Sequence, residues 1–375
     1  MSEKADVIII GAGIAGASLA FELAKHRDVV VLEWESQPGY HSTGRSAAML
    51  IETYGSEAVQ GLTRQSRVFF ENPPSDFAKT SLLSPRGYLH LARTDQQDAL
   101  SKVYEAVKKT MPSVQLLNTN ELCALAPLVD HDYAEAGLFE PDAMAIDAAA
   151  LHQGYLQGFA RQGGRLITYA VTTHVGAKNG GWEVVTASGS FEAPVLVNAA
   201  GAWADQLAVL ARVETIGLVP KRRTAILLDP PDGADTTNWP MVSDIDNEFY
   251  VKPEGTALMV SPADETPVPP SDAQPEELDV AIAVDRFERL TGKTVRSIRH
   301  RWAGLRSFVT DHSPIVGFDT KAPGFFWLAG QGGFGIMTAP AIAQLAASLI
   351  MKEKPHTPLT ALTANVSPKR LKTAS

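Results

Sequence analysis

A glycine-rich turn directly after a buried strand constrains this chain more than any other feature. Residues Val7–Ile10 form a run of four β-branched residues, which is typical of a strand buried on both faces. Gly11, Gly13 and Gly16 follow at once, and the next residues read as a helix. The first glycine permits the tight turn, the second lets the backbone approach a pyrophosphate, and the third lets the helix pack on the strand. The pattern predicts a dinucleotide site in an α/β fold.

An acidic residue at the end of the second strand supports this site. Residues 29–32 are again apolar and β-branched for the most part, and Glu33 follows them at the usual distance from Gly11. A carboxylate there accepts hydrogen bonds from ribose hydroxyls and repels a 2′-phosphate. The sequence therefore favours FAD or NAD over NADP.

The loop after Glu33 indicates which of the two cofactors binds. Residues 37–48 are small and rich in hydroxyl groups, where a second strand–helix unit would otherwise begin. We expect its polar side chains to bond phosphate and ribityl oxygens, and its alanines to leave room for the flavin ring. The polar residues are Ser42, Thr43, Arg45 and Ser46, and the alanines are Ala47 and Ala48. This loop favours FAD.

Composition narrows the class of protein. The chain has 375 residues, which is too long for one ordinary core and indicates two domains or one large α/β unit with insertions. With 45% hydrophobic and 20% charged residues, it is expected to be globular. A net charge of -9 without a long basic block argues against nucleic acid as a partner. Cys123 is the single cysteine, so we expect no internal disulfide, and the histidines show no shared metal-ligand spacing. Glycines interrupt the longest apolar stretch, so no integral membrane segment is expected.

With these features the chain resembles the D-amino-acid oxidase superfamily of FAD enzymes, and most closely its bacterial D-arginine dehydrogenase type. Besides the glycine turn and the loop at 39–48, the matching stretches are residues 151–156, 195–203, 220–223, 302–306 and 331–335. The resemblance implies FAD held without a covalent bond, although His41 lies where some amine-oxidising relatives attach the flavin. It further implies a cofactor site formed by Gly11, Ala12, Gly13, Ile14, Ala15, Gly16, Glu33, Val171, Ala200, Gly201, Trp203, Arg306, Gly332, Gly333, Phe334, Gly335 and Ile336, together with the loop residues named above.

The expected architecture is α/β with a mixed second sheet. A Rossmann-like FAD-binding domain is discontinuous and takes residues 1–80, 145–205 and 300–375. A substrate-binding domain built on a mixed β-sheet takes the two inserts, 81–144 and 206–299, where strand-like runs alternate with segments rich in Pro and Asp.

A carboxylate clamp is expected in the second domain. A guanidinium suits this task because its planar fork bonds both carboxylate oxygens. In a strand, Arg223 points to one face with Lys221, and Arg222 points to the other. The resemblance implies Arg223 and Arg306 as the carboxylate ligands, with the catalytic set completed by Tyr54 and Tyr250.

The substrate pocket departs from the arginine-specific pattern. Met49 stands where that type has a histidine, and Tyr88 stands where it has the acidic residue that pairs with a distal cation. We therefore expect a preference for neutral, apolar or aromatic side chains, with Glu52 as a carboxylate that can restore negative charge. Tyr54 and Gly55 are interpreted as part of a lid.

The resulting hypothesis is oxidative deamination of D-amino acids. A hydride passes from Cα to flavin N5, and water hydrolyses the imino acid to a 2-oxo acid and ammonia. A dehydrogenase is favoured, with a quinone, a dye-like acceptor or O₂ as the unknown oxidant. Two alternatives stay open: an O₂-using oxidase of glycine, sarcosine or other secondary amines, and a noncatalytic FAD-binding subunit of a complex. We expect a cytoplasmic monomer or small homo-oligomer, and attachment at the inner face of the membrane stays open.

Overall fold

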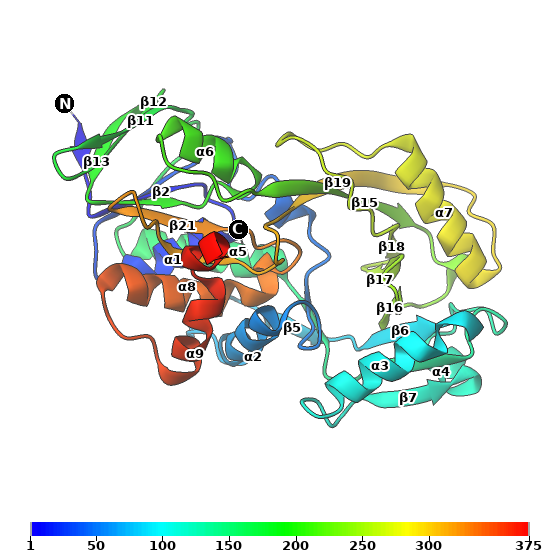
Figure 1. Cartoon of the computed structure of the whole chain (residues 1–375). Coiled ribbons are helices and arrows are strands. Elements are labelled where there is room, and N and C mark those ends of the chain that lie inside the picture. The colour runs from blue at the N-terminus through cyan, green and yellow to red at the C-terminus, as the bar shows by residue number, and fades with distance from the viewer. Residues whose placement is uncertain (1, 374–375) are drawn as a thin grey trace.

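The computed structural model describes residues 2–373 as two lobes joined by long strands (Figure 1). The first lobe is built on a sheet with the strand order β10–β3–β2–β14–β21–β20, parallel except for β20. In this order the strands are Arg165–Ile167, Val29–Leu32, Val7–Ile10, Val195–Asn198, Phe325–Ala329 and Ile315–Phe318. The central strands are buried on both faces, which explains their nearly unbroken apolar sequences.

Helices cover one face of this sheet. They are α1 (Ile14–Leu23), α2 (Glu57–Glu71), α5 (Ala148–Arg161), α8 (Gly335–Met351) and α9 (Thr357–Val366). A hydrophobic core lies on each face of the sheet, and alternate residues of β2 point into one or the other. Val7 and Ile9 pack with the helices, whereas Ile8 and Ile10 pack on the opposite face. Because both faces are covered by apolar groups, the position of β2 and of the turn that follows it is strongly fixed.

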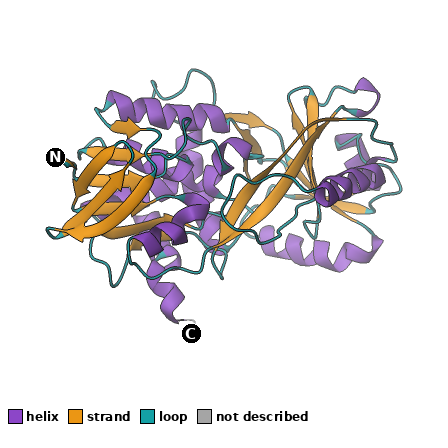
Figure 2. Cartoon of the chain, turned by 90° about the horizontal axis from the view of Figure 1, so that it is seen from above, coloured by secondary structure: helices purple, strands orange, loops and turns teal. Residues whose placement is uncertain are grey.

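A small sheet and one helix cover the opposite face. The sheet has the order β1–β13–β12–β11, with strands Glu3–Lys4, Gly189–Ala193, Gly181–Thr186 and Thr172–Lys178, and the helix is α6 (Ala204–Leu210). This sheet lies at the top of the first lobe in Figure 1 and faces the viewer in Figure 2, which is seen from above. Trp182 and Phe191 pack from it against Ile8 and Leu196 of the central strands.

The second lobe is a mainly antiparallel sheet with the order β19–β15–β18–β17–β16–β6–β8–β7. In this order the strands are Ile298–Phe308, Val219–Leu228, Ala257–Ser261, Tyr250–Glu254, Met241–Asp244, Tyr88–Ala92, Ala136–Glu140 and Gln115–Asn118. The helices α3 (Gln97–Val107), α4 (Thr119–Leu125) and α7 (Glu277–Thr291) pack in this lobe. Residues of β6, β16, β17 and β18 form one core with α7, so the sheet presents its other face toward the first lobe.

Short elements connect the lobes. A sheet of β4 (Met49–Leu50), β9 (Met144–Ile146) and β5 (Leu83–Pro85) lies between them.

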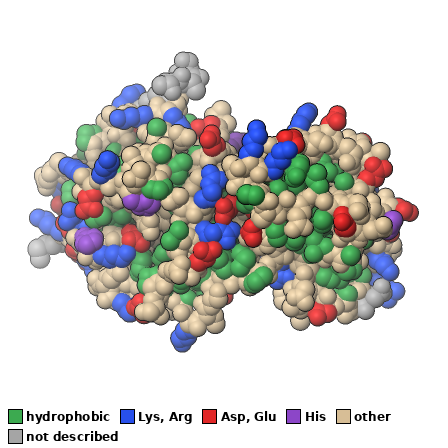
Figure 3. Space-filling view, turned by 90° about the horizontal axis from the view of Figure 1, so that it is seen from below, with side chains coloured by type: hydrophobic (Ala, Val, Ile, Leu, Met, Phe, Trp, Pro, Cys, Tyr) green, Lys and Arg blue, Asp and Glu red, His purple; other side chains and the backbone are tan. Residues whose placement is uncertain are grey.

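Short 3₁₀ turns are spread along the described chain. They are η1 (Ser42–Arg45), η2 (Thr94–Gln96), η3 (Gly201–Trp203), η4 (Pro231–Gly233) and η5 (Pro368–Thr373). Seen from below, acidic and basic side chains lie together along the junction of the lobes (Figure 3).

Two expected domain boundaries fall inside strands. The boundary at residue 300 divides β19, which pairs with β15 from Ile298 to Phe308 and therefore belongs to the second sheet. The boundary at 145 divides β9. Within residues 2–373, no helix combines the length and the apolar character that crossing a membrane requires.

Candidate active site

The glycine turn after β2 can only be made with glycines at two of its positions. Gly11 has a φ of 102°, and a Cβ there would lie 2.4 Å from the carbonyl oxygen of Ala199. A Cβ on Gly16 would lie 1.9 Å from the carbonyl oxygen of Gly11, because α1 packs directly on the turn. A Cβ on Gly13 would lie 3.3 Å from Thr43 Oγ1. Gly13, Ile14 and Ala15, at the N-terminus of α1, line a cavity, as an anion site requires.

The Glu33 carboxylate lies beside this turn. It accepts hydrogen bonds from the backbone N–H of Ala12 at 2.7 Å and of Glu35 at 2.9 Å, and it is 9% exposed. Each carboxylate oxygen retains a lone pair for a further donor. The residue is thus held rigidly while it can still accept hydrogen bonds from ribose hydroxyls.

The cavity next to Glu33 has a volume of about 330 Å³ and largely apolar walls. Trp34 and Trp203 contribute rings whose centroids lie 6.1 Å apart, edge to face. The backbone of Ala170–Thr172, which includes Val171, forms another part of the wall, as do Ala200 and Gly201. Trp34 is 56% exposed, an unusual position for a tryptophan unless a ligand covers it. These walls suit a planar base and its ribose.

Cavities lined by described residues continue from this one toward the second lobe. A middle cavity of about 140 Å³ shares Gly13 and Thr43 with the first, and a third of about 390 Å³ shares Ala47 and Gly333 with the middle one. An elongated ligand can therefore extend from Glu33 to the face of the second sheet. The predicted cofactor residues Ile14, Ala15, Ser46, Ala48, Gly332, Phe334, Gly335 and Ile336 line the middle or the third cavity.

The loop at 42–48 is bonded to both lobes. Thr43 Oγ1 accepts the N–H of Ile14 at 3.0 Å, and Ser42 Oγ donates to the carbonyl of Leu305 at 2.7 Å. Arg45 was expected to bond cofactor oxygens, but its guanidinium donates to the carbonyls of Ala303 and Ala273 and pairs with Asp272. Arg45 lines the middle cavity, yet it serves to fasten the loop to the second lobe.

The four residues of the predicted clamp lie on one cavity. Tyr54, Arg223, Tyr250 and Arg306 all line the third cavity. Arg223 and Arg306 come from the paired strands β15 and β19, and Arg306 donates to the hydroxyl of Tyr54 at 3.4 Å. Gly333 packs so closely that a Cβ would lie 2.8 Å from a guanidinium nitrogen of Arg306. The cofactor path and the clamp therefore meet at Gly333.

The two arginines have different partners. The Glu265 carboxylate accepts from Arg223 at 3.0 Å and from Lys221 at 2.8 Å, while Arg222 pairs with Asp279 at 2.8 Å on the other face of the strand. Burial, and then the positive charge of Arg306, lower the pKa of Arg223. Among the residues that the structure describes, Arg306 forms no ion pair, so its charge is available to an anionic ligand.

Part of the wall of the third cavity is apolar and packs with the tyrosines of the clamp. It includes the predicted pocket residues Met49 and Tyr88, and also Ile51, Met241, Phe249 and Met337. Burial raises the pKa of the Tyr88 hydroxyl, which accepts a hydrogen bond from Ser243 at 2.8 Å. His90 Nδ1 lies 3.0 Å from the same serine, and burial lowers the pKa of His90 to about 4. These polar groups are therefore uncharged at neutral pH.

Glu52 does not lie where it was expected. Its carboxylate pairs with Arg67 of α2, and Glu52 is absent from the residues that line the third cavity. An arginine fifteen positions along the chain reaches it from the adjacent helix, so its charge is neutralised outside the pocket.

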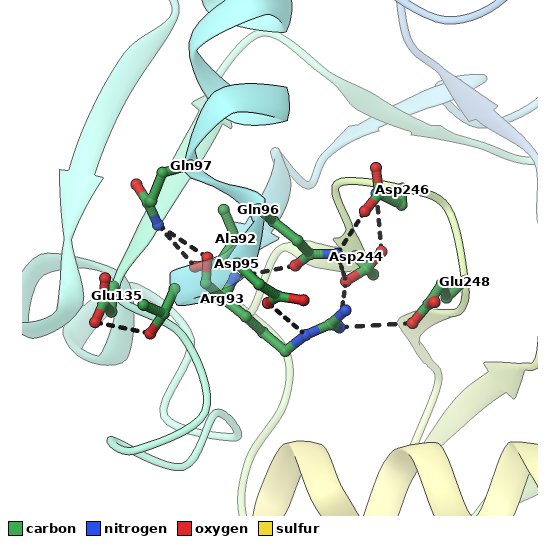
Figure 4. Close-up of polar contacts among 10 residues, drawn as sticks. Ala92, Arg93, Asp95, Gln96, Gln97, Glu135, Asp244, Asp246 and Glu248 are labelled. Atoms are coloured by element: carbon green, nitrogen blue, oxygen red, sulfur yellow. Dashed lines mark hydrogen bonds and ion pairs between the residues drawn. The ribbon is translucent and has the colours of Figure 1, made fainter.

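A loop that the sequence reading did not select completes the rim. Asp246 and Asn247, which follow β16, line the third cavity together with Glu265, Phe308 and His312. Gln96 donates to Asp244 at 3.0 Å and to Asp246 at 2.7 Å, and Arg93 pairs with Asp244 at 2.8 Å (Figure 4). Asp246 and Glu265 stand in polar connecting segments, which resemble ordinary surface loops in the sequence. Among the described residues there is no group of three or more His, Cys, Asp or Glu side chains placed to hold a metal ion.

Comparison with known proteins gives a consistent family. The profile of the family described as FAD dependent oxidoreductase (DAO) matches residues 6–349. The mitochondrial dimethylglycine dehydrogenase of Rattus norvegicus is 25% identical, with 97% of this chain and 45% of that protein covered. This chain thus spans just under half of that relative's length. Glycine oxidase of Geobacillus kaustophilus (strain HTA426) is 24% identical, with 94% of this chain and 95% of the oxidase covered.

Solved structures share the fold. L-proline dehydrogenase from P. horikoshii has a TM-score of 0.86 at 22% identity, with both chains covered completely. The crystal structure of glycine oxidase from Geobacillus kaustophilus has a TM-score of 0.84 at 22% identity, with 96% of this chain and 98% of the oxidase covered. At these identities the likeness shows the fold alone.

Proposed function

This chain belongs to the FAD dependent oxidoreductase (DAO) family, and from this premise we propose that it oxidises D-amino acids with neutral, mainly apolar side chains. FAD is its cofactor. The observation that carries the proposal is the third cavity. Arg306, a guanidinium without an acidic partner among the described residues, lines both the middle cavity of the cofactor path and this third cavity, whose wall is partly apolar.

The residues present fit FAD along the whole path. The glycine turn and the N-terminus of α1 would hold the pyrophosphate, Glu33 the ribose, and Trp203 with Val171 the adenine. The segment from Gly332 to Ile336 would hold the flavin end. Bound FAD supplies the two-electron oxidation of the carbon that carries the amine.

A noncovalent attachment is part of the proposal. His41 lines the cavity at the adenosine end, and its Nε2 lies 2.9 Å from Glu35 Oε1. Cys123 belongs to α4 in the second lobe. Neither residue lines the third cavity, where the flavin ring would face the substrate.

The clamp would bind the substrate's carboxylate. Arg306 supplies a planar fork that Tyr54 orients, and Arg223 adds a second positive charge that Glu265 partly balances. Tyr250, which is 8% exposed, adds a hydroxyl to the same cavity. Fixing the carboxylate fixes Cα, which is the positional requirement for oxidation by a flavin.

The cavity would also favour the reactive form of the amine. Arg306 has no acidic partner among the described residues, so an additional positive charge is disfavoured next to it and an ammonium group held there loses its proton more readily. The amine lone pair is then free to assist the oxidation. Water outside the site would hydrolyse the imino product to a 2-oxo acid and ammonia.

The apolar part of the cavity wall supports a preference for neutral side chains. Tyr88 is uncharged and Glu52 is paired with Arg67 outside the cavity, while the carboxylate of Asp246 lies at the rim, where Gln96 donates to it. Met49, Met241 and Met337 have flexible side chains that adapt to different apolar groups. A strong preference for D-arginine, which the resemblance to D-arginine dehydrogenase would suggest, is therefore not part of the proposal.

A product assay tests this function. The holoenzyme is incubated with an artificial two-electron acceptor and one member of a panel of D- and L-amino acids, and 2-oxo acid and ammonia are measured. Equal yields of both products from neutral D-amino acids, lost in Arg306→Ala, would support the proposal. Turnover of D-arginine far above D-leucine would contradict the pocket assignment.

A second candidate is oxidation of glycine or N-methylated glycines. It is favoured by the relatives, whose names include glycine oxidase and dimethylglycine and sarcosine dehydrogenases. The same clamp would hold these substrates, and they would leave the apolar wall unused. Including glycine and sarcosine in the panel, with and without O₂ as sole acceptor, separates the two candidates and distinguishes an oxidase from a dehydrogenase.

A further inference from the structure

A buried carboxylate of the second lobe bonds the loop that carries Tyr54. Glu140, the last residue of β8, is 2% exposed. One of its oxygens accepts the backbone N–H of Glu52 at 3.2 Å, and the other accepts the hydroxyl of Thr53 at 2.6 Å. Both contacts stand immediately before Tyr54, whose hydroxyl accepts from Arg306.

Apart from the contacts of the Tyr54 side chain with Arg306 and Phe334, two further anchors of this loop come from α2. Gln60 Nε2 donates to the carbonyls of Thr53 and Gly55, at 3.0 and 3.2 Å, and Arg67 pairs with the carboxylate of Glu52. Glu140 differs because it belongs to the sheet that forms the substrate wall, where it lies opposite Tyr88 in the β6–β8 pair. Glu140 therefore lies between Tyr88, which it faces across the β6–β8 pair, and the loop that carries Tyr54.

We propose that Glu140 is a positioning residue that fixes the 52–55 loop against the second sheet and thereby keeps the Tyr54 hydroxyl on Arg306. This role rests on the proposed function, because it acts through the carboxylate clamp. Neither Glu140 nor Thr53 lines the third cavity, so their effect on the substrate is indirect and passes through residues such as Tyr54.

The charge of Glu140 decides how many loop donors it can accept. As a carboxylate it accepts both donors, whereas a protonated oxygen can no longer accept one of them. Burial is the largest effect on Glu140 and raises its pKa to about 7. The charge of Glu52 also raises the pKa of Glu140. The hydrogen bonds from Thr53 and from the N–H of Glu52, and the charge of Arg67, lower it. Tyr88, which faces it from β6, is neutral. Anchoring should therefore strengthen as the pH rises through 7.

Two variants remove the contact from opposite sides. Glu140→Gln keeps the size but loses an acceptor, and Thr53→Val keeps the shape but loses the hydroxyl. Thr53→Ser retains the hydroxyl and serves as the conservative rescue. Glu135→Gln is the matched control, because this glutamate lies just before β8 and bonds the exposed Thr94. Melting temperature and bound-flavin absorbance verify that each variant folds and retains FAD.

The first measurement is hydrogen exchange of the backbone amides at 52–56 in the holoenzyme, at pH 6 and pH 8 after correction for intrinsic rates. We expect faster exchange at pH 6 than at pH 8 in the parent protein, and fast exchange at both pH values in Glu140→Gln and Thr53→Val. Thr53→Ser and Glu135→Gln should behave like the parent. Unchanged exchange in Glu140→Gln would overturn the proposal, whether or not the protein oxidises amino acids.

The second measurement is the dissociation constant of benzoate, a carboxylate that cannot be oxidised, from the change in flavin absorbance. Loss of one loop hydrogen bond should weaken benzoate about tenfold at pH 8, and Glu140→Gln with Thr53→Val should be no worse than either alone. Parent affinity in Glu140→Gln would overturn the positioning role. Failure of the parent protein itself to bind benzoate would contradict the proposed clamp, and the exchange measurement would still decide whether Glu140 anchors the loop.

Discussion

At the scale of single residues, the two arginines of the clamp are not equivalent. Arg223 has Glu265 as a partner and donates to the carbonyl of Asp264, so part of its hydrogen-bonding capacity is used inside the protein. Arg306 contacts the Tyr54 hydroxyl and the Gly333 backbone, and its charge has no acidic partner among the described residues. Substrate carboxylate should therefore depend more on Arg306 than on Arg223.

Substitution tests this difference. We predict that Arg306→Lys raises the KM for a neutral D-amino acid about tenfold to a hundredfold, because one charged hydrogen bond contributes about 1.5–3 kcal/mol. Arg223→Lys should have a smaller effect, since Glu265 can pair with a lysine as well. Arg222→Lys, on the opposite face of β15, is the control for general damage. Equal losses in Arg306→Lys and Arg223→Lys would show that the two share the carboxylate evenly.

His90 should make the fold sensitive to acid. Its pKa is lowered by burial to about 4, below the value of 6.5 expected for an unfolded chain, so the unfolded state gains a proton first. The stability that neutral His90 contributes is complete above pH 6.5 and is lost as the pH falls toward 4. Glu140 changes the stability in the opposite direction. Its pKa is raised in the folded state, so the folded state gains a proton before the unfolded state as the pH falls below 7, and this favours folding.

Thermal unfolding from pH 7 to pH 5 separates these contributions. Relative to the parent, His90→Gln should lose less melting temperature as the pH falls, and Glu140→Gln should lose more. Changes of the same sign in both variants would mean that other groups dominate the acid response.

At this scale the sequence predicted what depends on local spacing. Glu33 and the glycines after β2 follow from a pattern within 33 residues, and the alternation of Lys221, Arg222 and Arg223 follows from the geometry of a strand. The environment of Arg45 could not be predicted, because its partner Asp272 lies more than two hundred residues away. The same holds for Glu140, which the sequence reading did not select.

At the scale of elements, the contact of α1 with β2 determines whether the cofactor site forms. Since a Cβ on Gly16 would lie 1.9 Å from a backbone oxygen, the helix would have to move away from the strand. We predict that Gly16→Ala lowers the melting temperature and releases FAD on gel filtration. Gly13→Ala, where the nearest atom is a side-chain oxygen at 3.3 Å, should keep the melting temperature of the apoprotein and weaken FAD only. Retention of FAD by Gly16→Ala would contradict the packing argument.

The sheet to which β19 belongs could not be predicted from the sequence. The sequence prediction places residues 302–306 in the cofactor domain, because the motifs of that domain fall in three separated blocks and the last block begins at residue 300. In the structure the same strand pairs with β15 over its full length and supplies Arg306 from the second sheet. Pairing between strands about eighty residues apart leaves no local signal, whereas the shorter strands β6, β17 and β18 were recognisable from their apolar runs.

At the scale of the whole molecule, the cofactor path lies between the lobes and should hold them together. FAD would contact the glycine turn of the first lobe and the cavity beneath the second sheet. A ligand that binds only the folded protein stabilises it by about 2.7 kcal/mol at a hundred times its dissociation constant. We predict that removal of FAD lowers the melting temperature and that added FAD restores it in a concentration-dependent way. An apoprotein as stable as the holoenzyme would show that the lobes are joined by protein contacts alone.

The central claim is most directly tested by anaerobic stopped-flow absorbance of the holoenzyme mixed with D-leucine, L-leucine or sarcosine. The proposed function predicts rapid loss of the flavin band with D-leucine, little change with the other two, and a large rate loss in Arg306→Lys. Rapid bleaching by sarcosine with none by D-leucine would contradict it and assign the site to N-methylated glycines instead.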